Sequence, residues 1–239
     1  MGRRFLSLTD HRSGGSKMRI VNVMVGGPAQ EIPEALVLAR QAEPWIGVDY
    51  GATYLLERGI VPLMALGDFD STQPAKLAAL QAQVPTVRFY PPEKDYTDTQ
   101  IGVKAALEEL KADQINLFGA TGGRLDQLLA NLYFPLMAEF QPCLEKLVII
   151  DRQNEVRYFR PGFHTLHQLP GMKYLAFVNL TPVTGLTLPD EKYRLTDYDA
   201  PIPISWSSNE FAGPVNHFSF KSGIVAVIQS KDSPATARR

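Results

Sequence analysis

The first two-thirds of the chain alternates short apolar runs with segments of helical periodicity. The apolar runs predict β-strands at Ile20–Val25, Trp45–Val48, Leu63–Leu66, Val87–Tyr90, Ile115–Phe118 and Leu147–Ile150. The segments between them predict helices at Pro33–Gln41, Ala52–Arg58, Pro74–Gln83 and Asp98–Lys111, and one marked by Leu125, Leu128, Leu129 and Leu132. Strands that alternate with helices are typical of a mainly parallel sheet covered on both faces.

The pattern changes after about Asn154, where helical periodicity disappears. Short β-rich segments follow, separated by turn-forming residues, at Val156–Phe159, Lys173–Val178, Gly185–Leu188 and Ile224–Gln229. Short strands with frequent turns are typical of a sandwich. We therefore expect an α/β fold followed by an all-β one. Residues 18–153 would form a Rossmann-like parallel sheet with flanking helices, and residues 154–239 a β-sandwich.

The composition is that of an ordinary globular protein. Of 239 residues, 45% are hydrophobic and 21% are charged, and the formal net charge is -1. Because there is no basic excess, we expect no nucleic-acid partner. Because no apolar run reaches the ~20 residues that span a bilayer, we expect no membrane partner either. Cys143 is the single cysteine, which favours a cytoplasmic location. The polar residues 1–17 are expected to form a disordered extension.

Polar clusters follow the predicted strands, at the point where each strand ends. In open α/β sheets, ligands bind beyond the carboxyl ends of the strands. Loops that carry glycines and carboxylates are therefore expected to meet at one edge of the sheet. These loops are Gly26–Gly27, Asp49–Gly51, Gly67–Ser71, Lys94–Asp98 and Gly119–Asp126.

Three of the carboxylates are candidate ligands for a magnesium ion. Asp68 and Asp70 are two residues apart, so in an extended segment both would point the same way, and Asp98 is the third candidate. Mg²⁺ prefers oxygen ligands and is commonly shared between carboxylates and substrate phosphates. The alternative is that Asp68 and Asp70 only cap a turn, and the matching chemistry of the other loops favours the metal site.

The fourth loop contains a helix start signal. Thr97 followed by Gln100 matches a capping box, which puts Asp95 and Asp98 at a helix N-terminus. One interpretation is favourable pairing with the helix dipole and no catalysis. The other is that free amides there bind phosphate while Asp98 holds the metal. Lys94 either neutralises phosphate charge or is a solvated surface lysine.

The glycine-rich turn Gly119–Gly123 lets the backbone approach a ligand closely and opens a helix. It matches neither the P-loop nor the dinucleotide-binding pattern. Arg124 and Asp126 follow on the first turn of that helix, near the predicted edge. Arg124 could stabilise charge on a transferring phosphoryl group. The alternative is a local surface ion pair between the two, contributing ~0–1 kcal/mol.

In the β-rich part, Ser205–Phe211 combines small hydroxyls and an amide with aromatic residues. This combination suits recognition of a flat heteroaromatic ring, with contacts from Trp206, Ser208 and Asn209. The alternative is a polar loop beside a core tryptophan.

Taken together and in order, these motifs resemble the thiamine pyrophosphokinase family. The resemblance is carried by Asp49–Ala52, Gly67–Ser71, Lys94–Asp98, Gly119–Asp126 and Ser208–Phe211, which span most of the chain from Met18 onward. It implies an N-terminal α/β domain, a C-terminal β-sandwich and a homodimer whose active sites lie between subunits. It also implies ATP and thiamine as substrates and Mg²⁺ as cofactor.

By this resemblance Asp68, Asp70 and Asp98 match the metal and phosphate residues. The expected catalytic residues are Asp70, Asp98, Arg124 and Asp126. Contacts with ATP are expected from Gly27, Asp49, Asp68, Lys94, Asp95, Thr97, Thr121, Gly122 and Gly123, and contacts with thiamine from Trp206, Ser208 and Asn209.

The sequence departs from the family pattern at a few positions. Tyr50 stands where glycine is expected, which could alter the rim of the nucleotide pocket. Gln127 stands where many bacterial members carry histidine, and Trp206 where a small or aliphatic residue is more usual. None of these departures removes a carboxylate.

The activity implied is direct in-line attack of the thiamine hydroxyl on the β-phosphorus of Mg·ATP, with AMP as leaving group. Two alternatives remain open at this point. One is diphosphate transfer to another heteroaromatic alcohol on the same scaffold. The other is a non-catalytic nucleotide or thiamine sensor.

Overall fold

The structure is a computed structural model that describes residues 18–91, 93 and 95–233. The expected extension 1–17 and Lys94 lie outside the described residues. The α/β half contains strands β1 Ile20–Met24, β2 Trp45–Val48, β3 Met64–Gly67, β4 Thr86–Phe89, β5 Gln114–Phe118 and β6 Leu147–Ile150. Its helices are α1 Glu34–Ala39, α2 Tyr50–Leu56, α3 Pro74–Gln83, α4 Asp98–Lys104 and α5 Leu125–Tyr133. Shorter helical turns are η1 Ala29–Glu31, η2 Ala105–Glu109, η3 Phe134–Leu136 and η4 Ala138–Lys146.

The second half consists of antiparallel strands. They are β7 Asn154–Phe159, β8 Gly162–His167, β9 Tyr174–Asn179, β10 Val183–Leu188, β11 Leu195–Ala200, β12 Ser205–Glu210, β13 Val215–Phe220 and β14 Val225–Ser230. The predicted fold class is therefore confirmed: a parallel α/β sheet precedes an antiparallel β region.

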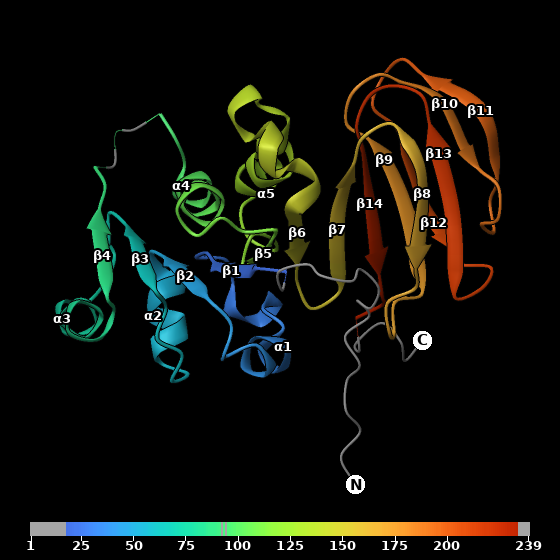
Figure 1. Cartoon of the computed structure of the whole chain (residues 1–239). Coiled ribbons are helices and arrows are strands. Elements are labelled where there is room, and N and C mark those ends of the chain that lie inside the picture. The colour runs from blue at the N-terminus through green and yellow to red at the C-terminus, as the bar shows by residue number, and fades with distance from the viewer. Residues whose placement is uncertain (1–17, 92, 94, 234–239) are drawn as a thin grey trace, which may run out of the picture.

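One sheet runs through both halves of the molecule (Figure 1). Its strand order is β12-β9-β14-β7-β6-β5-β1-β2-β3-β4, and β1 to β6 pair in parallel. The direction changes where β6 meets β7 in antiparallel pairing. The change of pattern near Asn154 therefore marks a change of strand direction within one sheet. Whether the two halves are separate domains stays a prediction.

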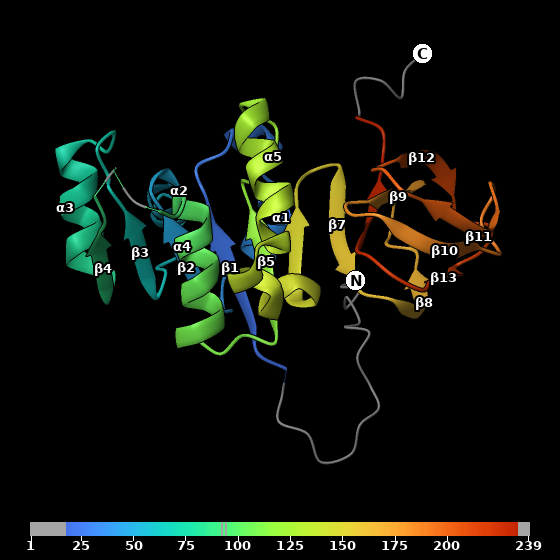
Figure 2. The same ribbon diagram turned by 90° about the horizontal axis from the view of Figure 1, so that it is seen from above.

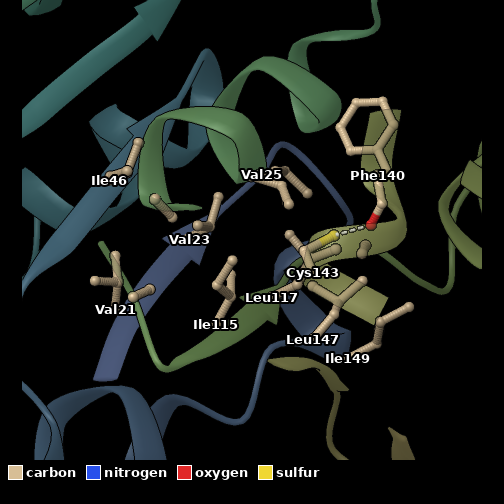
Figure 3. Close-up of a cluster of buried hydrophobic side chains, with 14 of the residues drawn as sticks. Val21, Val23, Val25, Ile46, Ile115, Leu117, Phe140, Cys143, Leu147 and Ile149 are labelled. Carbon is tan, nitrogen blue, oxygen red and sulfur yellow. Dashed lines mark hydrogen bonds between the residues drawn. The ribbon is translucent and has the colours of Figure 1, made fainter. Parts of the chain in front are cut away.

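Helices cover both faces of the parallel part of the sheet. α4 and α5 lie on one face and α1 and α2 on the other (Figures 1 and 2). Alternate residues of β1 pack on the two sides of the sheet. Val21 and Val23, with Val25 just after the strand, pack under α4 and η4, whereas Met24 packs on the side of α1 and α2. Figure 3 shows the first of these cores, in which Cys143 donates its thiol to the carbonyl of Phe140. Strands buried on both faces explain the continuous apolar runs.

The β region is a two-layer arrangement. A second sheet, of order β11-β10-β13-β8, packs against the antiparallel end of the long sheet. Its core joins Leu186 and Phe218 of one sheet with Phe177 and Val227 of the other. This is the arrangement expected of a sandwich, whose inner faces interdigitate.

Two helix predictions differ from the structure. The helix predicted to reach Lys111 leaves α-geometry after Lys104 and continues as the π-turn η2. The leucine stripe of α5 packs only in part, because Leu125 is 68% and Leu129 43% exposed. Among the described helices, none is long and apolar enough to cross a membrane.

Candidate functional site

A cavity of about 860 Å³ opens at the carboxyl ends of β1, β2, β3 and β5. The first turns of α4 and α5 close its sides. Most of the residues predicted from the loops line it, namely Gly27, Asp49, Asp68, Asp95, Thr97, Asp98, Thr121, Gly123 and Arg124. The edge expected from strand order is therefore where these groups meet. Tyr50 and Gln127, two of the departures from the family pattern, also line it.

Two glycine loops form the floor of the cavity by direct backbone contact. A Cβ on Gly27 would collide with the carbonyl oxygen of Gly119. Gly119 itself has a φ of 71°, which favours glycine. A Cβ on Gly122 would collide with the side chain of Glu31, so this loop also packs closely against η1. Gly122 does not line the cavity, and its lack of a Cβ permits this packing.

Asp49 shapes the loop after β3. Its φ is 47°, and its Oδ1 accepts the backbone N–H of Asp68 at 3.1 Å. Phe69, the next residue, has a φ of 56°, a conformation that bulky residues seldom adopt. Asp49 therefore contributes to the cavity by fixing where Asp68 stands, in addition to lining it.

The three candidate metal ligands are placed differently. Asp68 and Asp98 both line the cavity, but Asp70 does not. The expectation that Asp68 and Asp70 point the same way assumed an extended segment, and the left-handed backbone of Phe69 breaks it. Asp70 is exposed and donates its backbone N–H to Asp68 Oδ1 at 3.0 Å.

The donor set of the cavity fits magnesium. Within the described residues, no three His, Cys, Asp or Glu side chains are grouped as a metal site. Mg²⁺ does not need such a group, because it commonly takes one or two carboxylates together with phosphate oxygens and water. Asp68 and Asp98 supply two hard oxygen donors that line one cavity.

The capping box that begins α4 is confirmed. Thr97 Oγ1 accepts the N–H of Gln100 at 3.3 Å, and Gln100 Oε1 accepts the N–H of Thr97 at 2.8 Å. These reciprocal bonds fix the first turn of the helix, which carries Asp98 to the wall of the cavity.

Arg124 and Asp126 form the local ion pair that was the alternative to a catalytic arrangement. Arg124 Nη2 and Asp126 Oδ2 are 2.5 Å apart, and the side chains are 76% and 61% exposed. The hydrogen bond from Arg124 lowers the pKa of Asp126 from its usual value. Arg124 lines the cavity, whereas Asp126 does not. A carboxylate of lowered pKa is a poor general base.

The predicted thiamine segment lies elsewhere in the chain. All residues that line the cavity fall between Val25 and Asn131, so Trp206, Ser208 and Asn209 are outside it. Their strand, β12, is the edge strand at the opposite end of the long sheet from β4. Its pairing with β9 shifts register between Trp206 and Asn209, and Ser208 has a φ of 58°. Such bulges re-aim side chains and are common beside functional sites.

Comparison with known proteins matches both halves of the chain. The family model described as "Thiamin pyrophosphokinase, catalytic domain" matches residues 36–144, and "Thiamin pyrophosphokinase, vitamin B1 binding domain" matches residues 163–225. A Bacillus subtilis (strain 168) protein named thiamine pyrophosphokinase is 34% identical over 217 residues, covering 90% of this chain and 100% of the relative. The chain belongs to the thiamin pyrophosphokinase family.

Solved structures agree with this family. An Enterococcus faecalis thiamin pyrophosphokinase family protein is 40% identical, covers 90% of this chain and 100% of its own, and has a TM-score of 0.84. A Lactobacillus plantarum protein is 46% identical, with coverage of 90% and 99% and a TM-score of 0.82. Asp49, Asp68 and Asp98 lie within the range that the catalytic-domain model matches. Trp206 and Asn209 lie within the range that the vitamin-binding model matches.

Tyr193, within the range matched by the vitamin-binding model, is an aromatic residue that the sequence did not single out. Asn209 is 2% exposed, and its amide both accepts the N–H of Tyr193 and donates to the carbonyl of Tyr193, at 2.8 Å each. The ring of Tyr193 is 58% exposed. Asn209 therefore holds the backbone of an exposed aromatic residue and has little surface of its own to offer a ligand. No local pattern around Tyr193 indicates this pairing.

Proposed function

We propose that the protein transfers a diphosphate group from Mg·ATP to the hydroxyl of thiamine, giving thiamine diphosphate and AMP. The observation that carries the proposal is the cavity in which Asp68 and Asp98 lie together with the glycine loop Gly119–Gly123 and Arg124. Transfer of a phosphoryl-type group requires positioning and charge neutralisation more than covalent chemistry. This cavity offers groups for both.

In this proposal Asp68 and Asp98 hold Mg²⁺ from the wall of the cavity. Asp70 lies outside the cavity in this structure, and it would join the ion only after the loop turns inward when Mg·ATP binds. The ion would neutralise charge on the phosphates of ATP. Asp49, Asp95, Thr97 and the glycine loops shape the pocket around the nucleotide, and Lys94 adds positive charge. Arg124 meets charge that develops during transfer.

Arg124 can leave Asp126 for the substrate at little cost. Both side chains are exposed, and solvent and salt screen an exposed ion pair so that it contributes little to stability. In this proposal Asp126 therefore holds the Arg124 side chain in an ion pair until ATP binds. Its lowered pKa argues against a function as general base for the thiamine hydroxyl.

Thiamine would be bound by a second copy of the chain. Trp206, Ser208 and Tyr193 do not line the cavity of their own chain. If thiamine binds at these residues, a second chain would have to bring it to the ATP site. An apolar stripe on α5 is exposed beside the cavity mouth, formed by Leu125, Leu129 and Tyr133 at four-residue spacing. We therefore propose a homodimer with shared active sites, whose interface covers this stripe.

Mixing two inactive variants tests the shared site. Asp68→Asn disables the cavity, and Ser208→Arg puts a cation on the exposed segment that would meet the cationic thiazolium ring. We expect co-expressed variants to recover about one quarter of wild-type AMP formation. With random pairing about half of the dimers are mixed, and each mixed dimer has one intact site of two. Each variant alone is the control. Activity that stays at the level of the single variants would refute the shared site.

The direct assay uses ATP, Mg²⁺ and thiamine. We expect AMP and thiamine diphosphate to appear in equal amounts. AMP formation with another heteroaromatic alcohol but not with thiamine would favour a different acceptor. Binding of ATP and thiamine without AMP release would indicate a sensor. The proposal includes a cytoplasmic location, supported by the single, buried Cys143, and no nucleic-acid or membrane partner.

A further inference from the structure

Asp151 lies beside the nucleotide cavity although it follows a strand that sequence reasoning left without a site. β5 and β6 pair in parallel with Phe118 opposite Ile150, so the loops that follow them begin side by side. The loop after β5 is the glycine turn that contains Thr121. Asp151 opens the loop after β6 and is only 7% exposed.

The carboxylate of Asp151 is saturated with donors. Oδ1 accepts the backbone N–H groups of Gln153 at 2.8 Å and Asn154 at 2.7 Å. Oδ2 accepts the hydroxyl of Thr121 at 2.7 Å, and the Asn154 amide donates to both oxygens. Because a carboxylate can only accept, the proton of the Thr121 hydroxyl is committed to Asp151.

Contacts on either side of Thr121 hold the loop that carries it. Asn131, 5% exposed, donates its amide to the carbonyl of Ala120 at 2.9 Å. On the other side of Thr121, Gly122 packs against Glu31. The turn of Asp151 is fixed to the same region, since Arg152 donates its backbone N–H to the carbonyl of Glu31 at 2.9 Å.

The consequence is a hydroxyl of defined polarity at the wall of the cavity. Thr121 is partly exposed and lines the cavity. With its proton used, Thr121 Oγ1 offers the cavity only lone pairs. The oxygens of an ionised triphosphate are also acceptors, so Thr121 is unsuited to bind them. It is suited to a donor.

We propose that Asp151 is a positioning residue that fixes Thr121 as an acceptor for a hydrogen-bond donor on the nucleoside part of ATP, a sugar hydroxyl or the base amino group. This rests on the proposed ATP site. In this proposal two kinds of group in the glycine loop bind different parts of ATP. Its backbone amides donate to the phosphates, and the Thr121 side chain accepts from the nucleoside.

Equilibrium binding of Mg·ATP by calorimetry tests this without relying on turnover. We expect Thr121→Val to weaken binding about threefold to tenfold, the usual effect of one lost hydrogen bond, and Thr121→Ser to restore it relative to valine. Asp151→Asn should weaken binding as well, because an amide N–H can donate to Thr121 and free its proton toward the ligand's donor. Thr184→Val is the matched control, since Thr184 bonds Ser222 in the β region, at 2.7 Å.

ATP analogues that each lack one donor identify the partner. They are 2′-deoxy-ATP, 3′-deoxy-ATP and the triphosphate of purine riboside. We expect one of them to bind wild-type protein about threefold to tenfold more weakly than ATP does. On the Thr121→Val variant, the same analogue and ATP should bind with equal affinity. That result supports the proposal and tells a sugar hydroxyl from the base.

Three results would overturn it. Thr121→Val could bind ATP as wild type does, Asp151→Asn could bind ATP more tightly because a freed hydroxyl now donates to phosphate, or no analogue could show coupling to Thr121. The test is separate from the proposed function. Wild-type protein that binds ATP but forms no AMP with thiamine would refute the transferase activity and leave the binding comparison intact.

Discussion

Asp68→Asn is expected to lower AMP formation at saturating ATP and thiamine by at least about 100-fold. Loss of one preorganised electrostatic group in an active site typically costs this much. The substitution is close to isosteric, and Oδ1 can still accept the N–H of Asp70, so the loop is retained while the negative charge is lost. Asp98→Asn should have a similar effect. Steady-state AMP release over a range of Mg²⁺ concentrations is the measurement.

Asp70→Asn tests whether Asp70 is a metal ligand together with Asp68 and Asp98. We expect it to abolish turnover, because the proposal has Asp70 turn into the cavity and join Asp68 and Asp98 when Mg·ATP binds. Turnover close to wild type in Asp70→Asn would remove it from the set and leave Asp68 and Asp98. The matched control is Asp113→Asn, at the amino end of β5, where an exposed carboxylate accepts the N–H of Arg19. Near-normal AMP formation by Asp68→Asn itself would refute the metal assignment.

The α/β half could be predicted because its signals are local. Strands buried on both faces are continuous apolar runs, and the capping box of Thr97 begins a helix through contacts within one turn. Because ligands in open α/β sheets bind beyond the carboxyl ends of the strands, the loops could then be predicted to meet at one cavity. The expected extended segment around Asp68 and Asp70 is wrong, because Phe69 adopts a left-handed conformation. Nothing in the residue types indicates this conformation.

The β half was harder to predict because several strands bury little. β8 and β12 each bury a single residue fully, Leu166 and Asn209, so their alternation is faint. β11 buries only Ala200. Contacts such as Asp151 with Thr121 or Asn209 with Tyr193 join residues that are distant in sequence, and only the folded chain brings them together. The exposure of Leu125 and Leu129 on α5 likewise depends on which elements pack against this helix, and the local sequence does not give that.

Glu191→Gln is expected to change how stability depends on pH. Glu191 is 1% exposed, between β10 and β11, and forms an isolated bridge to Phe211. Its Oε2 accepts the N–H of Asp190 at 3.2 Å, while Oε1 has no hydrogen-bond partner among the described residues. Burial, followed by repulsion from Asp190, raises the pKa of Glu191 to about 7, and nearby His217 opposes the shift.

The sign follows from proton linkage. Since the pKa of Glu191 rises from 4.5 in the unfolded chain to about 7 in the fold, the folded state binds more protons between these values. The free energy of unfolding should therefore fall as pH rises from about 4.5 through about 7. Glutamine mimics the protonated form. We expect Glu191→Gln to be roughly 3 kcal/mol more stable than wild type near pH 8, and to differ from it by less than about 1 kcal/mol near pH 5. Urea unfolding at both pH values measures this.

Glu210→Gln is the matched control for this effect. Glu210 lies on the neighbouring strand, and its pKa is lowered by the hydrogen bond from Lys192, so it stays ionised throughout that pH range. A variant at Glu210 should therefore run parallel to wild type between about pH 5 and pH 8. If Glu191→Gln also ran parallel to wild type, the burial of Glu191 would not be raising its pKa. The carboxyl would then be ionised inside the β region, with a compensating donor bound to Oε1.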